Sequence, residues 1–201
     1  MIAYRKERIE NAILFFAKEH YKKTKNYISQ TALYKYLAFF EFRHLAKYGE
    51  MPLELQYKAM EQGPVPIEIY SKRDDAQGFS LVKFEPTQIQ SGVTIYIIKP
   101  IGKFNADYFS ENELEEMKNL TEIFAQQWVT ASVMSDASHR DIRAWAKTYK
   151  TSPNAMINPI DNFIRDIEMV ASNELKPEEE RFLMHQKLAD YIAKNTQMVT
   201  A

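Results

Sequence analysis

Histidine and cysteine, two residue types that often perform catalysis or bind transition metals, are sparse in this chain. It has no cysteine, which excludes disulfides, cysteine-ligated zinc, iron–sulfur clusters and thiol nucleophiles. The four histidines are His20, His44, His139 and His185, and no two have the i, i+4 spacing of a helical zinc site. The sequence therefore gives no positive sign of a metal site or of any other cofactor.

Motifs that cradle phosphate or activate a serine are also missing from the sequence. It contains no G-x-S-x-G, no Walker A motif and no G-x-G-x-x-G, and it has only five glycines. The acidic runs at 115–116 and 178–180 fall on expected exposed helix faces or helix N-termini. Solvated charge is the simpler interpretation of these runs, because general acid–base catalysis needs burial or a partner. We identify no catalytic residues.

Two stretches have a more distinctive pattern. Residues 63–70 read Gly-Pro-Val-Pro-Ile-Glu-Ile-Tyr, which predicts a rigid turn with Pro66 opening a short helix. Residues 136–145 read Asp-Ala-Ser-His-Arg-Asp-Ile-Arg-Ala-Trp. Both stretches could be structural corners, with His139 bonded to backbone and Trp145 buried, or they could form part of a binding surface. The residues alone leave both interpretations open.

Helices are expected to precede these motifs. Apolar residues at three- and four-residue spacing predict a first helix over 4–21. A second helix should start after Ser29, a good N-cap, and end near residue 48, with Gly49 just past its end. The second helix has too many large apolar residues for one narrow stripe, so we expect it to be central and covered on several sides.

The rest of the chain predicts a hairpin followed by more helices. Residues 79–84 and 93–98 have the composition of two strands joined by a long loop. Ser110 and Glu113 form a capping box that should begin a helix reaching about residue 128. Further helices are predicted over 129–134, from about 138, over 160–170 and over 177–193. The expected fold class is α+β, mainly α: a helical core with one β-hairpin insertion.

Composition and charge are those of an ordinary globular protein. The chain has 201 residues, of which 45% are hydrophobic and 26% charged, enough to bury a core without disulfides. The net charge of -1 excludes a chain-wide basic field, although residues 1–50 hold ten basic and five acidic groups, and residues 151–201 five basic and eight acidic. Because we find neither a membrane-length apolar stretch nor a secretory pattern, we expect no membrane association and a cytoplasmic location.

The two motifs, in this order and separation, resemble the Panacea antitoxin domain family, also called the SocA-like or phage-associated GepA-like family. The resemblance covers roughly residues 5–150 and departs where Ser138 stands in place of the usual threonine. The matching segments are the Tyr-containing helix at 33–38, the Gly-Glu-Met-Pro at 49–52, residues 57–70 around Gly63-Pro64-Val65, and Ser138-His139 with Trp145 downstream. The expected division is a Panacea-like domain over 1–150 and a C-terminal helical extension over 151–201 packed on the same domain.

The resemblance implies an interaction protein rather than an enzyme. Members resemble antitoxins of toxin–antitoxin systems, which bind and neutralise a cognate toxin protein. The SocA branch also resembles a proteolytic adaptor that delivers a client to an ATP-dependent protease. Such proteins occur in bacteria, phages, prophages and other mobile elements.

The residues that carry the resemblance are also the candidates for partner binding. Tyrosine, tryptophan and arginine are favoured interface anchors, although for any single aromatic residue a core position is the simpler interpretation. The candidates are Tyr57, Gly63, Pro64, Val65, Pro66, Tyr70, Ser138, His139, Arg143 and Trp145. They form either a contact surface or a rigid structural signature.

Two other functions remain open at this point. Helices followed by a hairpin are also the order of a winged-helix DNA-binding protein, but the helix after Ser29 offers few polar side chains that could reach base edges, so nucleic acid is an unfavoured partner. A hydrolase with a site scattered in sequence would need a deep pocket joining His139 to Asp136 or Asp141.

Overall fold

The computed structural model describes residues 2–75, 78–89 and 92–199 of the chain. The helices are α1 (Arg5–Thr24), α2 (Gln30–Tyr48), α3 (Ile67–Lys72), α4 (Glu111–Phe124), α5 (Ala131–Asp141), α6 (Arg143–Thr151) and α7 (Pro177–Val199). The strands are β1 (Ile28–Ser29), β2 (Tyr57–Met60), β3 (Gly63–Pro66), β4 (Val82–Gln88) and β5 (Thr94–Pro100). The fold is α+β and mainly α, as the sequence predicts.

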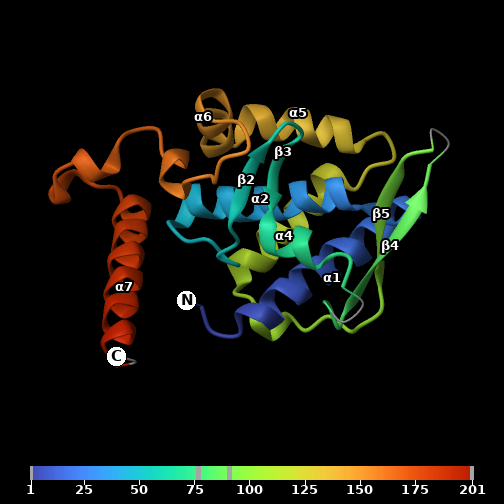
Figure 1. The fold of residues 1–201 in the computed structure, drawn as a ribbon, viewed down its shortest axis with the longest axis horizontal. Coiled ribbons are helices and arrows are strands. Elements are labelled where there is room, and N and C mark those ends of the chain that lie inside the picture. The colour runs from blue at the N-terminus through green and yellow to red at the C-terminus, as the bar shows by residue number, and fades with distance from the viewer. Residues whose placement is uncertain (1, 76–77, 90–91, 200–201) are drawn as a thin grey trace.

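Helix α2 is the centre of the molecule, and the other elements are arranged around it (Figure 1). The Ser29 side chain accepts a hydrogen bond from the Ala32 amide at 3.3 Å, and Gly49 ends the helix with φ 75°. Both predicted caps are therefore confirmed. The helix contacts α1, α4, α5, α7, β1, β3 and β5. Because α2 is enclosed in this way, it cannot enter a DNA groove as the recognition helix that the winged-helix alternative requires.

The strands form two small sheets, one of three strands and one of two. Strands β1, β5 and β4 form an antiparallel sheet in which Ile98 of β5 pairs with both Ile28 and Phe84. This confirms the hairpin predicted over 79–98, although β4 begins at Val82 and β1 adds a strand that the sequence did not predict.

A second hairpin contains the first of the two motifs. Strands β2 and β3 pair from Tyr57 opposite Pro66 to Met60 opposite Gly63. The expected rigid turn at 63–66 is therefore wrong, because these residues form a strand and the turn lies at 61–62. Prolines lack an amide donor, and a strand that pairs on one side only can accommodate them. Pro66 does open the short helix α3, as predicted.

The helices after the sheets differ from the prediction in where they break. The capping box of Ser110 and Glu113 is present and starts α4, but α4 ends at Phe124 rather than near residue 128. The two helices predicted over 129–134 and from 138 are one helix, α5, whose N-cap Thr130 accepts from the Val133 amide. The real break comes at Ile142, where φ -97° and ψ 90° separate α5 from α6.

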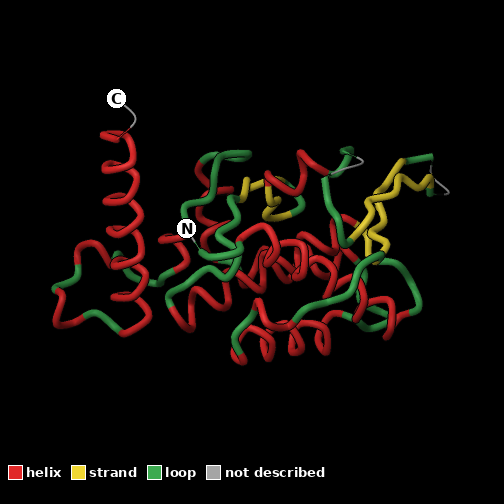
Figure 2. Tube along the Cα trace, turned by 90° about the horizontal axis from the view of Figure 1, so that it is seen from below, coloured by secondary structure: helices red, strands yellow, loops and turns green. Residues whose placement is uncertain are grey.

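The C-terminal segment contains one wrong helix and one correct one. The stretch predicted as a helix over 160–170 forms short 3-10 turns at Pro159–Asn162 and Ile167–Met169. The side chains of Asn158 and Asp166 accept backbone amides two residues on, an arrangement that competes with a continuous helix. The helix predicted from 177 is confirmed as α7, which stands at one end of the molecule with its C-terminal end extending from the body (Figures 1 and 2).

Within the described ranges, none of the helices has both the length and the apolar character that a membrane span requires.

Candidate functional site

Three segments that are distant in sequence converge where the two motifs meet. They are α2, the β2–β3 hairpin and the α5–α6 pair, and α2 and β3 both contact α5. Their side chains and backbone form a group that we call the signature cluster: Lys35, Gly63, Ser138, His139 and Trp145. Four of its members belong to the two sequence motifs, and Lys35 comes from the N-terminal part of α2, within the segment 33–38.

The hairpin glycine fits the cluster because it has no side chain. Gly63 has φ 103°, a conformation that favours glycine. A Cβ atom at this position would lie 2.5 Å from Lys35 Nζ and 2.6 Å from Ser138 Oγ. The Ser138 hydroxyl donates to the Ser135 carbonyl at 2.7 Å. The hairpin backbone therefore packs directly against a buried lysine and a buried serine.

Trp145 fixes the hairpin to the α5–α6 pair from the other side. Its indole Nε1 donates to the Met60 carbonyl oxygen at 3.0 Å. The His139 ring stacks on the indole with centroids 4.0 Å apart and planes 7° apart, and Tyr149 stacks with centroids 4.9 Å from it. The tryptophan is only 6% exposed, whereas the stacked rings of His139 and Tyr149 are half-buried.

The outer edge of the hairpin is held by the chain that follows α6. The amide of Ala59 donates to the Ala155 carbonyl at 2.9 Å, and the Asn154 amide donates to the Ala59 carbonyl at 2.8 Å. The Ile157 amide donates to the Tyr57 carbonyl at 2.8 Å. Strand β2 is therefore hydrogen-bonded on both edges, to β3 and to residues 154–157, which makes the hairpin a rigid part of the domain.

The ten candidate residues fall into two groups by exposure. Those in the first group are buried: Tyr57, Gly63, Pro64, Pro66, Ser138 and Trp145. Those in the second group reach solvent in part or fully: Val65, Tyr70, His139 and Arg143. A residue of the first group can affect a partner only by holding the surface in place, whereas one of the second can touch it.

Tyr70 is the most accessible aromatic residue of the motifs. The Arg73 guanidinium lies over its ring, 3.9 Å from the centroid, and is 5.0 Å from the Tyr96 centroid. The Tyr96 hydroxyl in turn donates to Asp74. Tyr70 therefore belongs to a surface group of aromatic and charged side chains beside β5, separate from the signature cluster.

Burial changes the charge of the signature cluster. Lys35 is almost fully buried, and desolvation lowers its pKa to about 7. The pKa of His139 is also lowered, first by burial and then by the nearby Lys35, while Asp136 and a backbone hydrogen bond to Glu61 act in the opposite direction. Both lowered pKa values therefore favour the uncharged forms of Lys35 and His139.

A lysine-to-methionine variant should reveal this burial as a pH dependence of stability. The folded pKa of Lys35 is about 7 and the unfolded value is 10.5, so the unfolded chain binds the extra proton between these limits. The free energy of unfolding should therefore rise with pH between about 7 and 10, by at most about 1.4 kcal/mol per pH unit from this group. Lys35→Met should flatten that rise in urea titrations at several pH values. Equal pH slopes for the two proteins would contradict the lowered pKa of Lys35.

The hydrolase alternative requires a deep pocket that joins His139 to Asp136 or Asp141. Asp141 lines a cavity of about 410 Å³ together with Phe39, Trp128 and Val133, but His139 is not part of that lining. In the portion of the chain that the structure describes, no group of three or more histidine, aspartate or glutamate side chains is arranged to hold a metal ion.

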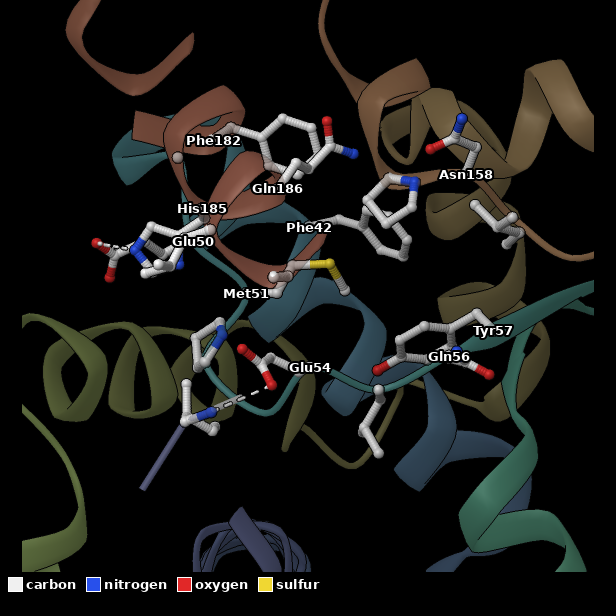
Figure 3. Close-up of a pocket in the computed structure, with 18 of the residues that line it drawn as sticks. Phe42, Glu50, Met51, Glu54, Gln56, Tyr57, Asn158, Phe182, His185 and Gln186 are labelled. Carbon is white, nitrogen blue, oxygen red and sulfur yellow. Dashed lines mark hydrogen bonds and ion pairs between the residues drawn. The ribbon is translucent and has the colours of Figure 1, made fainter. Parts of the chain in front are cut away.

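A second feature, which the sequence did not predict, is an open groove beside α7. This α7 groove has a volume of about 760 Å³ (Figure 3). Its body wall includes Phe42, Met51 and Leu55, and its α7 wall includes Phe182, Leu188, Ala189 and Ile192. The only sequence signal for it is the apolar spacing within α7, which by itself does not indicate whether a helix face is covered.

The core helix also positions the body wall of the groove. Glu41 of α2 is fully buried, and its carboxylate accepts hydrogen bonds from the amides of Leu53 at 2.6 Å and Leu55 at 3.3 Å. Burial raises the pKa of Glu41 to about 8 despite these two donors. The segment from Gly49 to Tyr57 is thereby attached to α2 through its backbone, and the groove has a fixed floor.

The fold and the site together define a class of protein. It is a small, mainly helical domain in which the signature cluster joins the central helix to a β-hairpin and a helix pair. A sequence model of the family described as antitoxin SocA-like, Panacea domain, matches residues 33–146, which run from α2 to just beyond Trp145. The chain belongs to this Panacea family. No curated protein and no solved structure shows significant similarity to it.

Proposed function

We propose that this chain is an antitoxin that binds a cognate toxin protein in the cytoplasm and neutralises it by contact rather than by catalysis. The observation that carries the proposal is family membership over residues 33–146. All the motif residues lie in this range, and so do the five members of the signature cluster.

The arrangement of the cluster supports a binding role. Six of the ten motif residues are buried, so they are suited to fixing the β2–β3 hairpin and the α5–α6 pair as a rigid frame. A rigid frame loses little conformational entropy when a partner binds, which favours tight association. In this proposal residues 1–150 form the Panacea-like domain, and residues 151–201 form an extension that contributes to the partner surface.

The test is co-expression with the product of the adjacent gene, each under its own promoter. We expect the neighbour alone to arrest growth, this chain to restore growth, and the two proteins to purify as a complex. A harmless neighbour that does not co-purify would contradict the antitoxin proposal for this locus.

Toxin levels distinguish neutralisation by contact from the proteolytic-adaptor alternative. Contact predicts that rescue leaves the amount of toxin unchanged on an immunoblot and persists in cells lacking the ATP-dependent proteases. An adaptor predicts that toxin disappears and that rescue fails in those cells. Salt gives a further check, because binding to a nucleic acid would weaken steeply as salt rises.

A further inference from the structure

The α7 groove lies between the body of the molecule and helix α7, whose first turns are anchored and whose later turns project. The first turns of α7 are fixed to the body: Phe182 packs against Phe163 with centroids 5.3 Å apart, and Glu179 pairs with Arg165. Gly49 packs so closely on α7 that an added Cβ would lie 2.1 Å from the Glu178 carbonyl oxygen. These contacts set the angle at which the helix leaves the body.

Beyond these anchors, the apolar side chains of α7 stay in solvent although they face the groove. Leu188 is 57% exposed and Ile192 is 51% exposed, and both line the cavity. In Figure 3 the labelled Phe42 and Met51 lie opposite the α7 side chains Phe182 and Gln186. Two apolar walls thus face each other across an open space, and exposed apolar surface of this kind marks an interaction site.

The charged residues of the groove indicate which kind of segment it could bind. Among the described residues, the charged side chains of its lining are three glutamates and one arginine, together with His185. The arginine, Arg8, already pairs with Glu113. Glu50 forms ion pairs at 3.7 Å with Arg181 and His185, and Glu54 accepts a hydrogen bond from the Ile2 amide at 3.2 Å. The groove therefore combines apolar walls with a net acidic rim, which is complementary to an apolar segment that carries a lysine or arginine.

The position of the groove relative to the family match suits a partner-specific surface. The 42–57 part of its body wall lies within the matched residues 33–146, whereas Ile2, Arg8, the 156–159 stretch and α7 lie outside them. The groove therefore joins the shared frame to the part of the chain that the family model does not cover.

We propose that the α7 groove binds an amphipathic segment of the toxin, which inserts large apolar side chains between α7 and the 49–57 segment and places a lysine or arginine at the Glu50–Glu54 rim. This inference rests on the proposed function. The apolar walls provide the affinity, and the acidic rim sets the orientation of the segment.

The test compares two substitutions on the same helix in the full chain. Leu188→Glu places a charge in the groove, and Met184→Glu places the same charge on a residue that is 63% exposed and does not line it. We expect Leu188→Glu to weaken toxin binding about 30-fold or more in titration calorimetry and to abolish growth rescue, as for a central interface anchor. Met184→Glu should behave like the unsubstituted chain.

A charge reversal tests the rim independently. Glu50→Lys should also weaken binding, whereas Glu115→Lys, an exposed position on α4 that does not line the groove, should not. Circular dichroism spectra and melting curves of all four variants check that they fold, and we expect little change because every substituted side chain reaches solvent.

The outcomes separate failure of this inference from failure of the proposed function. If the unsubstituted chain rescues growth and Leu188→Glu binds toxin equally well, the groove proposal is overturned and the antitoxin function stands. If light scattering shows that Leu188→Glu disrupts a dimer of this chain but not the toxin complex, the occupant is a second copy and the proposal is also wrong. If the unsubstituted chain neither rescues growth nor binds the neighbour, both proposals fail.

Discussion

Replacing Gly63 by alanine is expected to destabilise the domain by about 3 kcal/mol, from backbone strain of about 1–3 kcal/mol and crowding of a similar size. The strain arises because φ 103° is unfavourable for a residue with a side chain. The crowding arises because the new methyl would lie 2.5 Å from Lys35 Nζ and 2.6 Å from Ser138 Oγ. Neither neighbour can retreat easily, since both are buried. Urea denaturation gives the change in the free energy of unfolding.

Gly92→Ala is the matched control for this substitution. Gly92 also has a positive φ, 78°, but among the described residues no heavy atom beyond Gly92 and its chain neighbours lies within 4 Å of the position its Cβ would take. Its cost should therefore be backbone strain alone, about 1 kcal/mol. Equal losses for the two variants would show that Gly63 is needed only for its φ angle, and that the close packing of hairpin, lysine and serine contributes nothing.

Local signals account for the parts of the fold that the sequence predicts well. Helix α2 was predictable because both of its ends carry capping residues, Ser29 and Gly49, and its interior is densely apolar. The capping box at Ser110 and the proline and acidic residues at the start of α7 act in the same way. Each of these signals depends on neighbours within four residues, so it needs no knowledge of the tertiary structure.

The parts that the sequence missed depend on partners that are far away along the chain. The prolines at 63–66 suggest a turn, yet these residues form strand β3, and its partner strand β2 is paired on the other edge with residues 154–157. The false helix over 160–170 had helical spacing at Phe163 and Ile167, but capping side chains at Asn158 and Asp166 close separate turns instead. The spacing of apolar residues alone cannot distinguish a continuous helix from separate turns.

Only part of the candidate site could be predicted, because the rest depends on contacts between residues that are far apart in the sequence. Resemblance selected the motif residues, but it did not identify Lys35, which approaches Ser138 only because α2 packs against α5. The available signal was a lysine within the apolar run of α2, a position where a charged side chain is unusual. The α7 groove gave no such signal, since it depends on the angle that the contacts of Gly49 and Phe182 impose on α7.

Replacing Trp145 by alanine is expected to cost about 3–5 kcal/mol of stability, the range for large-to-small changes at buried aromatic residues. The substitution removes the hydrogen bond to the Met60 carbonyl and both stacked contacts, with His139 and Tyr149. Trp128→Ala is the matched control, because that tryptophan is 72% exposed and its loss should change stability by about 0.5 kcal/mol or less. Melting curves compare the two variants. A small effect of Trp145→Ala would contradict the structural role of the signature.

A milder variant determines whether Trp145 also touches the toxin. Trp145→Phe keeps an aromatic ring between His139 and Tyr149 but leaves the Met60 carbonyl without its donor, at a cost of about 1–3 kcal/mol. At a temperature where this variant is fully folded, the toxin affinity should equal that of the unsubstituted chain, because the indole is 6% exposed and offers no contact surface. Calorimetric titration with purified toxin measures it. A folded variant with a tenfold weaker affinity would place the indole at the interface, and the signature would then be a contact surface rather than a frame.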